Sequence, residues 1–188
     1  MTSSCSIKKM AVNAAGNALA SGGTTFTADD DPELIKAALP FSLKLMESLL
    51  ADNPNHTGLL TATASGFTQY AYAFVQEEAD EIEPEDFAVA EKMRARARRL
   101  YLRAQRYGLR GLDVKHPGFS NALLANPKSA VHASTRADVP LLYWTGAAWS
   151  LAVAASPGDP ALIADLPRCE ALLRRALELK EDYDAGAI

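Results

Sequence analysis

The stretch YWTGAAWSLAVAA, residues 143–155, contains two tryptophans, one glycine and no charged residue. A helix that crosses a bilayer needs about 20 consecutive apolar residues. The apolar run that starts at Val139 is shorter, and Pro140, Thr145 and Ser150 interrupt it. Its alanines and its glycine would let neighbouring helices approach from opposite sides, which is typical of a helix buried all round in a globular protein. The stretch therefore predicts a core helix rather than a membrane span.

The length and composition are those of one globular domain. The chain has 188 residues, of which 48% are hydrophobic and 22% are charged. The net charge is -4. Nucleic acids and anionic membranes attract proteins with a positive field, so this charge argues against both partners. We expect no nucleic-acid partner and no attraction of the protein surface to an anionic membrane.

Helical periodicity runs through the chain, and no segment alternates with the period of two that a strand requires. The sequence therefore predicts an all-α protein. A short helix is expected within residues 116–131, and the main helices are expected over residues 7–20, 32–51, 57–82, 85–107, 139–155 and 160–180.

Several residues indicate where these helices begin and end. Asp30 or Asp31 is a good N-cap, because Pro32 follows at the first helical position. Gly108 and Gly111 are expected to end the helix that starts near residue 85, since glycine often follows the last turn of a helix.

Three helices carry the spacing of the second helix of a tetratricopeptide (TPR) repeat: a small residue, a large apolar residue four positions later, a small residue three positions after that, and then a proline. The frame fits at Ser42, Met46, Leu49 and Pro54, at Ala97, Tyr101 and Ala104 without the proline, and again at Cys169, Leu173 and Ala176. We therefore expect degenerate, TPR-like antiparallel helix pairs that form a short superhelix. Residues 1–28 would be an N-terminal segment with a short helix, and residues 29–188 the TPR-like helical domain, in a single domain overall.

Aromatic side chains are candidates for the lining of a groove. Phe67, Tyr70 and Phe74 are spaced i, i+3 and i+7 and share one helical face. In a TPR-like superhelix the first helix of each pair lines the concave side, which would also place Trp144 and Trp149 there. These five residues are the predicted groove for a ligand or partner. The alternative is that each of them packs in the core.

The helix predicted over residues 85–107 has a cationic face. Arg96, Arg99, Arg103 and Arg106 are the candidate residues for docking an acidic partner. The alternative is a solvated surface that acids of the preceding helix neutralise, in which each exposed ion pair contributes little to stability.

Catalytic and metal-binding patterns are missing from the sequence. His56, His116 and His132 stand alone, without the paired spacing of zinc ligands. No glycine-rich phosphate loop follows a strand. We predict a protein that is not an enzyme, with no cofactor and no metal.

Cys5 follows two serines, as the acylated cysteine of a bacterial lipoprotein follows small residues. The local sequence leaves two interpretations open, a lipidated cysteine or an ordinary cysteine near a frayed terminus. No apolar signal segment precedes it in the sequence as written.

The runs SGFTQYAYAFVQEEAD, residues 65–80, and LLYWTGAAWSLAVA, residues 141–154, resemble the TatT family, the T component associated with tripartite ATP-independent periplasmic (TRAP) transporters. The resemblance covers the chain from about Ser4 to its end. It implies a periplasmic lipoprotein with a TPR-like fold, lipidated at Cys5, that associates with the substrate-binding P component. The sequence as given is expected to differ from the family pattern in two ways. The signal peptide is expected to be missing, and the C-terminus, DYDAGAI, is expected to be truncated where another helix would begin.

The resemblance predicts an adaptor that binds the P component and helps small organic or hydrophobic solutes to reach it. Two other hypotheses stay open at this point. One is a cytosolic TPR-like scaffold for protein or peptide partners, and the other is a stand-alone binder of a small ligand. The sequence leaves the oligomeric state open, a homo-oligomer included.

Overall fold

The computed structural model describes residues 3–21, 28–183 and 186. No residue in these ranges lies in a strand, so the predicted all-α class is confirmed. The elements are α1 (Ser3–Ser21), α3 (Pro32–Asp52), α4 (Thr57–Ala71), the π-helical η1 (Tyr72–Gln76), α5 (Glu77–Ile82), α6 (Phe87–Lys115), α7 (Phe119–Ala125), α8 (Pro127–Ala130), the 3-10 turns η2 (Val131–Ala133) and η3 (Arg136–Asp138), α9 (Val139–Ala154), α10 (Pro160–Ile163) and α11 (Leu166–Leu179).

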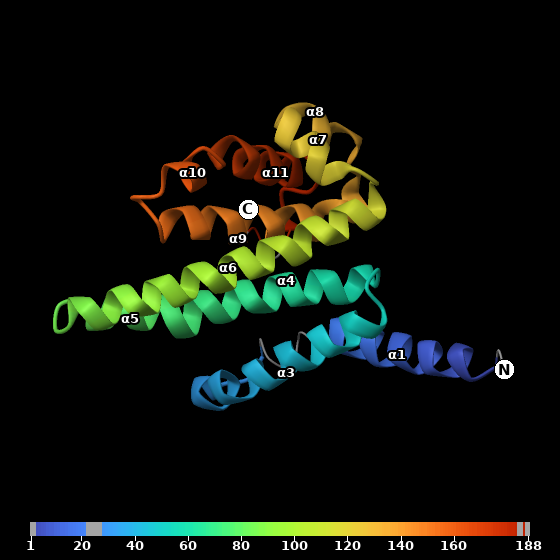
Figure 1. Cartoon of the computed structure of the whole chain (residues 1–188), viewed down its shortest axis with the longest axis horizontal. Helices are drawn as coiled ribbons and strands as arrows, with labels where there is room; N and C mark the ends of the chain where they lie inside the picture. Colours follow the sequence, from blue (N-terminus) through green and yellow to red (C-terminus); the bar gives the residue numbers. More distant parts are fainter. Residues whose placement is uncertain (1–2, 22–27, 184–185, 187–188) are drawn as a thin grey trace.

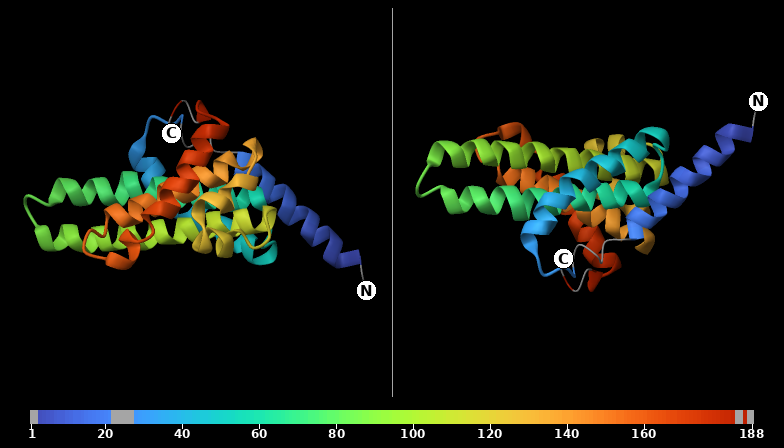
Figure 2. Two further views of the ribbon diagram at one scale, coloured as in Figure 1. Left: turned by 90° about the horizontal axis from the view of Figure 1, so that it is seen from above. Right: turned by 90° about the horizontal axis from the view of Figure 1, so that it is seen from below.

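The long helices pack against one another in chain order. Helix α3 lies on α4, α4 on α6, α6 on α9 and α9 on α11 (Figure 1). The α4–η1–α5 arm and α6 form a long hairpin that extends beyond the other helices at its α5 end (Figures 1 and 2). The arrangement is one of sequential helix pairs, and its TPR-like character stays a prediction.

Helix α9 is the core helix that its sequence predicts. Of its residues only Ala154 is exposed. It packs between α6 on one side and α11 on the other, and it also contacts α4 (Figure 1). The expectation of a helix buried all round is therefore confirmed, and α9 joins the two halves of the core.

The predicted end of the arginine helix is wrong. Gly108 and Gly111 do not stop α6, which continues to Lys115. Both glycines are buried where α6 meets α9. A Cβ on Gly108 would lie 3.3 Å from the Cα of Thr145, and a Cβ on Gly111 would lie 2.5 Å from Cδ2 of Leu141. They serve close helix packing, so their lack of a side chain matters more than their preference for helix ends.

Two other expected helices are interrupted. The helix expected over residues 57–82 contains the five-residue π-helix η1 (Tyr72–Gln76). The helix expected over residues 160–180 is divided into α10 and α11, because Pro167 starts a new helix after the turn at Ala164 and Asp165. The start of α3 follows the prediction, since the carboxylate of Asp31 accepts a hydrogen bond from Leu34 N at 2.9 Å.

The α6–α9 contact yields a test of the fold. The hydroxyl of Thr145 donates to the carbonyl of Leu141 at 2.5 Å, so it does not turn away freely from a new methyl group on Gly108. We expect Gly108→Ala to destabilise the protein by about 1–3 kcal/mol through overpacking, although alanine favours helix by about 1 kcal/mol. Chemical denaturation measures this change.

The matched control is Gly158→Ala. A Cβ on Gly158 meets no atom within 4 Å, so this change should leave the free energy of unfolding within about 0.5 kcal/mol of wild type. Equal stability of the two variants would contradict the close approach of α6 and α9.

Candidate functional site

The predicted aromatic residues of α4 and the predicted arginines of α6 meet in one place. Phe67 and Tyr70 are buried against α6, and Phe74 in η1 is half-buried beside Tyr70. The guanidinium carbon of Arg103 lies 4.8 Å from the ring centroid of Phe67. Arg96 lies over Tyr70 at 5.8 Å and donates to its hydroxyl oxygen at 3.2 Å. The aromatic faces thus hold two of the arginines by cation–π contact.

A buried carboxylate fixes Arg103 from the other side. The side chain of Glu47, on α3, is only 8% exposed. Its oxygens accept from Nε and Nη2 of Arg103 at 2.5 and 2.6 Å, from the Tyr107 hydroxyl at 2.8 Å and from Lys44 Nζ at 2.6 Å. This two-pronged arginine–carboxylate contact joins α3 to α6 with defined geometry.

The surroundings of Glu47 keep it ionised. Burial by itself would raise the pKa of Glu47, but hydrogen bonds from Lys44, Tyr107 and Arg103 outweigh burial and leave that pKa below its ordinary value. Burial and the neighbouring carboxylate raise the pKa of Tyr107, which therefore stays a hydrogen-bond donor. Sequence patterns alone did not identify Glu47. The pattern that could have identified it is an acidic residue on the face of α3 that also carries the buried Leu43 and Leu50.

The rest of the cationic face is turned to solvent. Arg99 and Arg106 are exposed, as is Lys92, and Arg110 is half-buried. Among the residues that the structure describes, none of these four cations forms an ion pair or a side-chain hydrogen bond. Within the described ranges these four cations are solvated without an acidic partner, whereas Arg94 pairs with Asp80, Glu83 and Glu91. Both interpretations of the cationic face, a docking surface and a solvated, mostly compensated surface, stay predictions.

The two tryptophans lie elsewhere, in the part of the core that α9 shares with α11. Trp149 is buried and its indole N–H donates to Asp165 at 3.1 Å. Trp144 is half-buried and donates to the hydroxyl of Tyr183 at 3.2 Å. The five predicted groove residues thus form two groups, and the existence of a common groove stays a prediction. The side chain of Cys5 lies outside the described residues, although its backbone belongs to α1.

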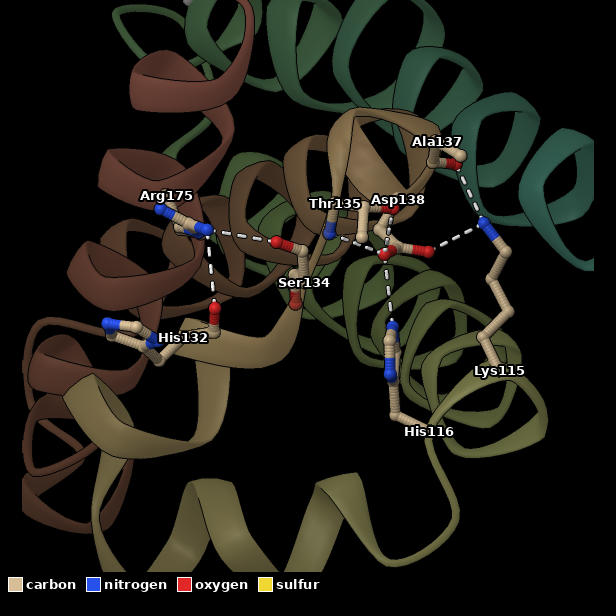
Figure 3. A network of polar contacts seen from close by, with 8 residues as sticks. All are labelled: Lys115, His116, His132, Ser134, Thr135, Ala137, Asp138 and Arg175. Atoms are coloured by element: carbon tan, nitrogen blue, oxygen red, sulfur yellow. Dashed lines mark hydrogen bonds and ion pairs between the residues drawn. The ribbon is translucent and has the colours of Figure 1, made fainter.

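A second polar cluster joins the end of α6 to the start of α9 (Figure 3). Asp138, whose side chain is 3% exposed, accepts from Lys115 Nζ at 2.6 Å and lies 3.0 Å from His116 Nε2. It also accepts from the backbone N–H and the hydroxyl of Thr135 at 2.8 and 3.0 Å. The sequence carried a signal for this cluster, because threonine three residues before aspartate is a capping-box pattern.

Arg175 of α11 holds the same loop from the opposite side. Its Nη2 donates to the carbonyl oxygens of His132 and Ser134 at 3.3 and 3.0 Å (Figure 3). The loop of η2 and η3 is thus bound to α6 at one end and to α11 at the other. These contacts are structural, and they leave His132 exposed.

A shallow depression lies between the first half of α6 and the turn after α9. Arg98 crosses it to pair with Asp159 at 2.6 Å, and Ser156 lines it. Within the described ranges no three or more histidine, cysteine, aspartate or glutamate side chains gather to hold a metal ion. None of the helices searched over those ranges combines the length and the apolarity needed to cross a bilayer.

Comparison with known proteins places the chain in a family. The model of the TRAP transporter T-component family, TAtT, matches residues 28–188. The chain belongs to the TRAP transporter T-component family.

A relative from Treponema pallidum (strain Nichols) supports the assignment. That protein, described only as an uncharacterized protein, is 36% identical over 167 residues, which cover 87% of this chain and 52% of the relative. The chain therefore spans about half the length of this curated relative.

The Glu47 cluster predicts a stability effect. We expect Glu47→Ala to destabilise the protein by about 2 kcal/mol, because it removes a charge-assisted pair and leaves Tyr107 without its acceptor. Thermal or chemical unfolding measures the loss. Arg174→Ala is the control, since its pair with Glu170 is exposed on both sides, with side chains 65% and 62% exposed, and contributes little. Equal losses in the two variants would contradict the account of Glu47.

The Asp138 cluster predicts a pH dependence. Burial alone would raise the pKa of Asp138, but bonds from Lys115, Thr135 and His116 hold it well below its ordinary value of 3.8. A carboxyl whose pKa is lowered by folding stabilises the protein above its unfolded pKa and loses this contribution as pH falls towards the folded pKa. Asp138→Asn should cost about 2–4 kcal/mol at pH 7.

The stability gap between wild type and Asp138→Asn should narrow below about pH 4, where the unfolded carboxyl takes up its proton. Urea denaturation at pH 7 and at pH 3.5 measures both values. A gap that stays constant between these two pH values would contradict the ionised, buried Asp138.

Proposed function

We propose that this protein is the periplasmic, lipid-anchored adaptor of a TRAP transporter system, and that it binds the substrate-binding P component through the cationic face of α6. One observation carries the proposal. Lys92, Arg99, Arg106 and Arg110 form no ion pair among the described residues, in a chain whose net charge is -4. Unpaired cations on a rigid helix steer and orient an acidic partner.

The framework around these cations supports docking. Arg96 and Arg103 lie on buried aromatic rings, and Glu47 fixes Arg103. The helix that bears them is buried along its other face by α4 and α9. A partner would therefore meet side chains on a preorganised scaffold, which lowers the entropy lost on binding.

The proposed anchor is a lipid on Cys5. Helix α1 projects away from the other helices towards its N-terminal end (Figure 2), so a lipid at that end would hold the helical body at a distance from the bilayer. A single acyl chain gives only marginal binding, and a diacylated cysteine would give stable attachment.

Passage of a small organic or hydrophobic solute to the P component is part of the proposal. Phe74 and Trp144 are the predicted groove residues that stay half-buried rather than buried. They are the aromatic side chains that a solute would reach first.

Charge reversal tests the docking surface. We expect Arg99→Glu with Arg106→Glu to weaken binding of the P component encoded beside the T component by at least about ten-fold, because two favourable cation contacts become repulsive. Surface plasmon resonance at about 0.05 M and 0.3 M salt measures the affinity, and wild-type binding should weaken at the higher salt through screening.

Lys128→Glu with Arg136→Glu is the matched control. Both residues are exposed and lie on elements that pack against α11. This control should bind as wild type does. No binding of the P component by the wild-type protein at micromolar concentration would end the proposed function.

A further inference from the structure

The cations of α6 have a regular spacing that bears on the shape of their partner, an inference that rests on the proposed function. Six cationic residues follow one another at alternating intervals of four and three, and they are Lys92, Arg96, Arg99, Arg103, Arg106 and Arg110. All six lie within α6. At 100° per residue they occupy an arc of roughly 80°, opposite the small buried residues, and they extend over about 27 Å.

Alternating steps of four and three average 3.5 residues, which is the repeat at which two α-helices stay in contact along their lengths. A strand rises by about 3.3 Å per residue and presents one face every second residue. The spacing of its side chains along one face therefore does not match the spacing of the cations along α6. The spacing therefore favours a helix as the element that lies along α6.

The positive charge of the row indicates that the partner helix is acidic. No acidic residue lies at the positions of the row. Glu47 of α3 contacts the row, but its carboxylate already accepts hydrogen bonds from Arg103, Lys44 and Tyr107. Like charges four residues apart destabilise a helix by a few tenths of a kcal/mol for each pair. The cations of the row thus repel one another, and carboxylates of a partner placed beside them would relieve this repulsion.

The width of the row also distinguishes a helix from an extended anionic surface. Glu81, in the last turn of α5, and Glu85, in the turn that follows, are exposed near the end of α6 where the row begins. A flat anionic bilayer laid on the row would approach these acids too. A single helix is narrow enough to contact the cations alone.

We propose that the cationic row of α6 binds an acidic α-helix of a partner protein, with aspartate or glutamate at alternating intervals of four and three over about five turns. Arg103, held by Glu47 and Phe67, is the fixed point in the middle of the row. The exposed cations on either side of it supply most of the charge contacts.

Two synthetic peptides test the proposal directly. Both have the same length, about 28 residues, and the same composition, alanine and glutamine with six glutamates. In one the glutamates alternate at intervals of four and three, and in the other they recur every five residues and so spread around the helix. Fluorescence anisotropy measures binding of each labelled peptide to the full chain at about 0.05 M salt.

We expect the patterned peptide to bind at least about ten-fold more tightly than its isomer, and its helical circular dichroism to increase on binding. Arg99→Glu with Arg106→Glu should abolish this preference, whereas Lys128→Glu with Arg136→Glu should keep it. Equal affinities for the two peptides, or no binding of either at hundreds of micromolar, would overturn the inference.

Failure of this inference and failure of the proposed function give different results. If the P component binds the wild type and the Arg99→Glu, Arg106→Glu variant equally well, the adaptor role stands and the cationic row is not its docking surface. If the patterned peptide binds selectively while the P component does not bind at all, the row accepts an acidic helix and the proposed transporter partner is wrong.

Discussion

The close approach of α6 and α9 is the contact on which the rest of the structure depends. Gly108 and Gly111 bring the backbone of α6 against Thr145 and Leu141 of α9, and Gly146 on the same helix receives Leu173 of α11. These small residues let α9 be buried on all sides. They also fix the rotation of α6 about its axis, because the side without side chains must face α9. Arg99 and Arg106, on the opposite side, are thereby exposed to solvent.

Polar clusters complete this arrangement at its edges. Glu47 ties α3 to the middle of α6, and Asp138 ties the end of α6 to the start of α9. In both, a nearly buried carboxylate is surrounded by several donors that keep its charge. Burying such charges contributes little net stability, but their hydrogen bonds require a defined geometry between the helices. The clusters thus fix how the helices meet, while the apolar contacts supply most of the stability.

The sequence predicted the class of the fold, the core position of α9 and an N-cap at Asp30 or Asp31, because each depends on local patterns. It failed at Gly108, where a residue that commonly ends helices instead fills a tight helix crossing. It also missed the π-helix η1, and it missed Glu47, because the partners Arg103 and Tyr107 lie more than 50 residues away in the chain. The aromatic and basic candidate residues were found from helical spacing, but only the structure shows that Phe67 and Tyr70 meet Arg103 and Arg96, and that the tryptophans lie apart from them.

Membership of the T-component family and the cations Lys92, Arg99, Arg106 and Arg110, unpaired among the described residues, support one proposal. In it, α6, a rigid helix buried on one side by small residues, offers its cationic side to an acidic partner of the transport system. A crystal or electron cryomicroscopy structure of the protein bound to its P component tests this claim most directly. The account predicts acidic side chains of the P component within about 4 Å of Arg99 and Arg106, the usual limit for an ion pair. A P component seated on α11 or on the η2–η3 loop, with the α6 cations still facing solvent, would contradict it.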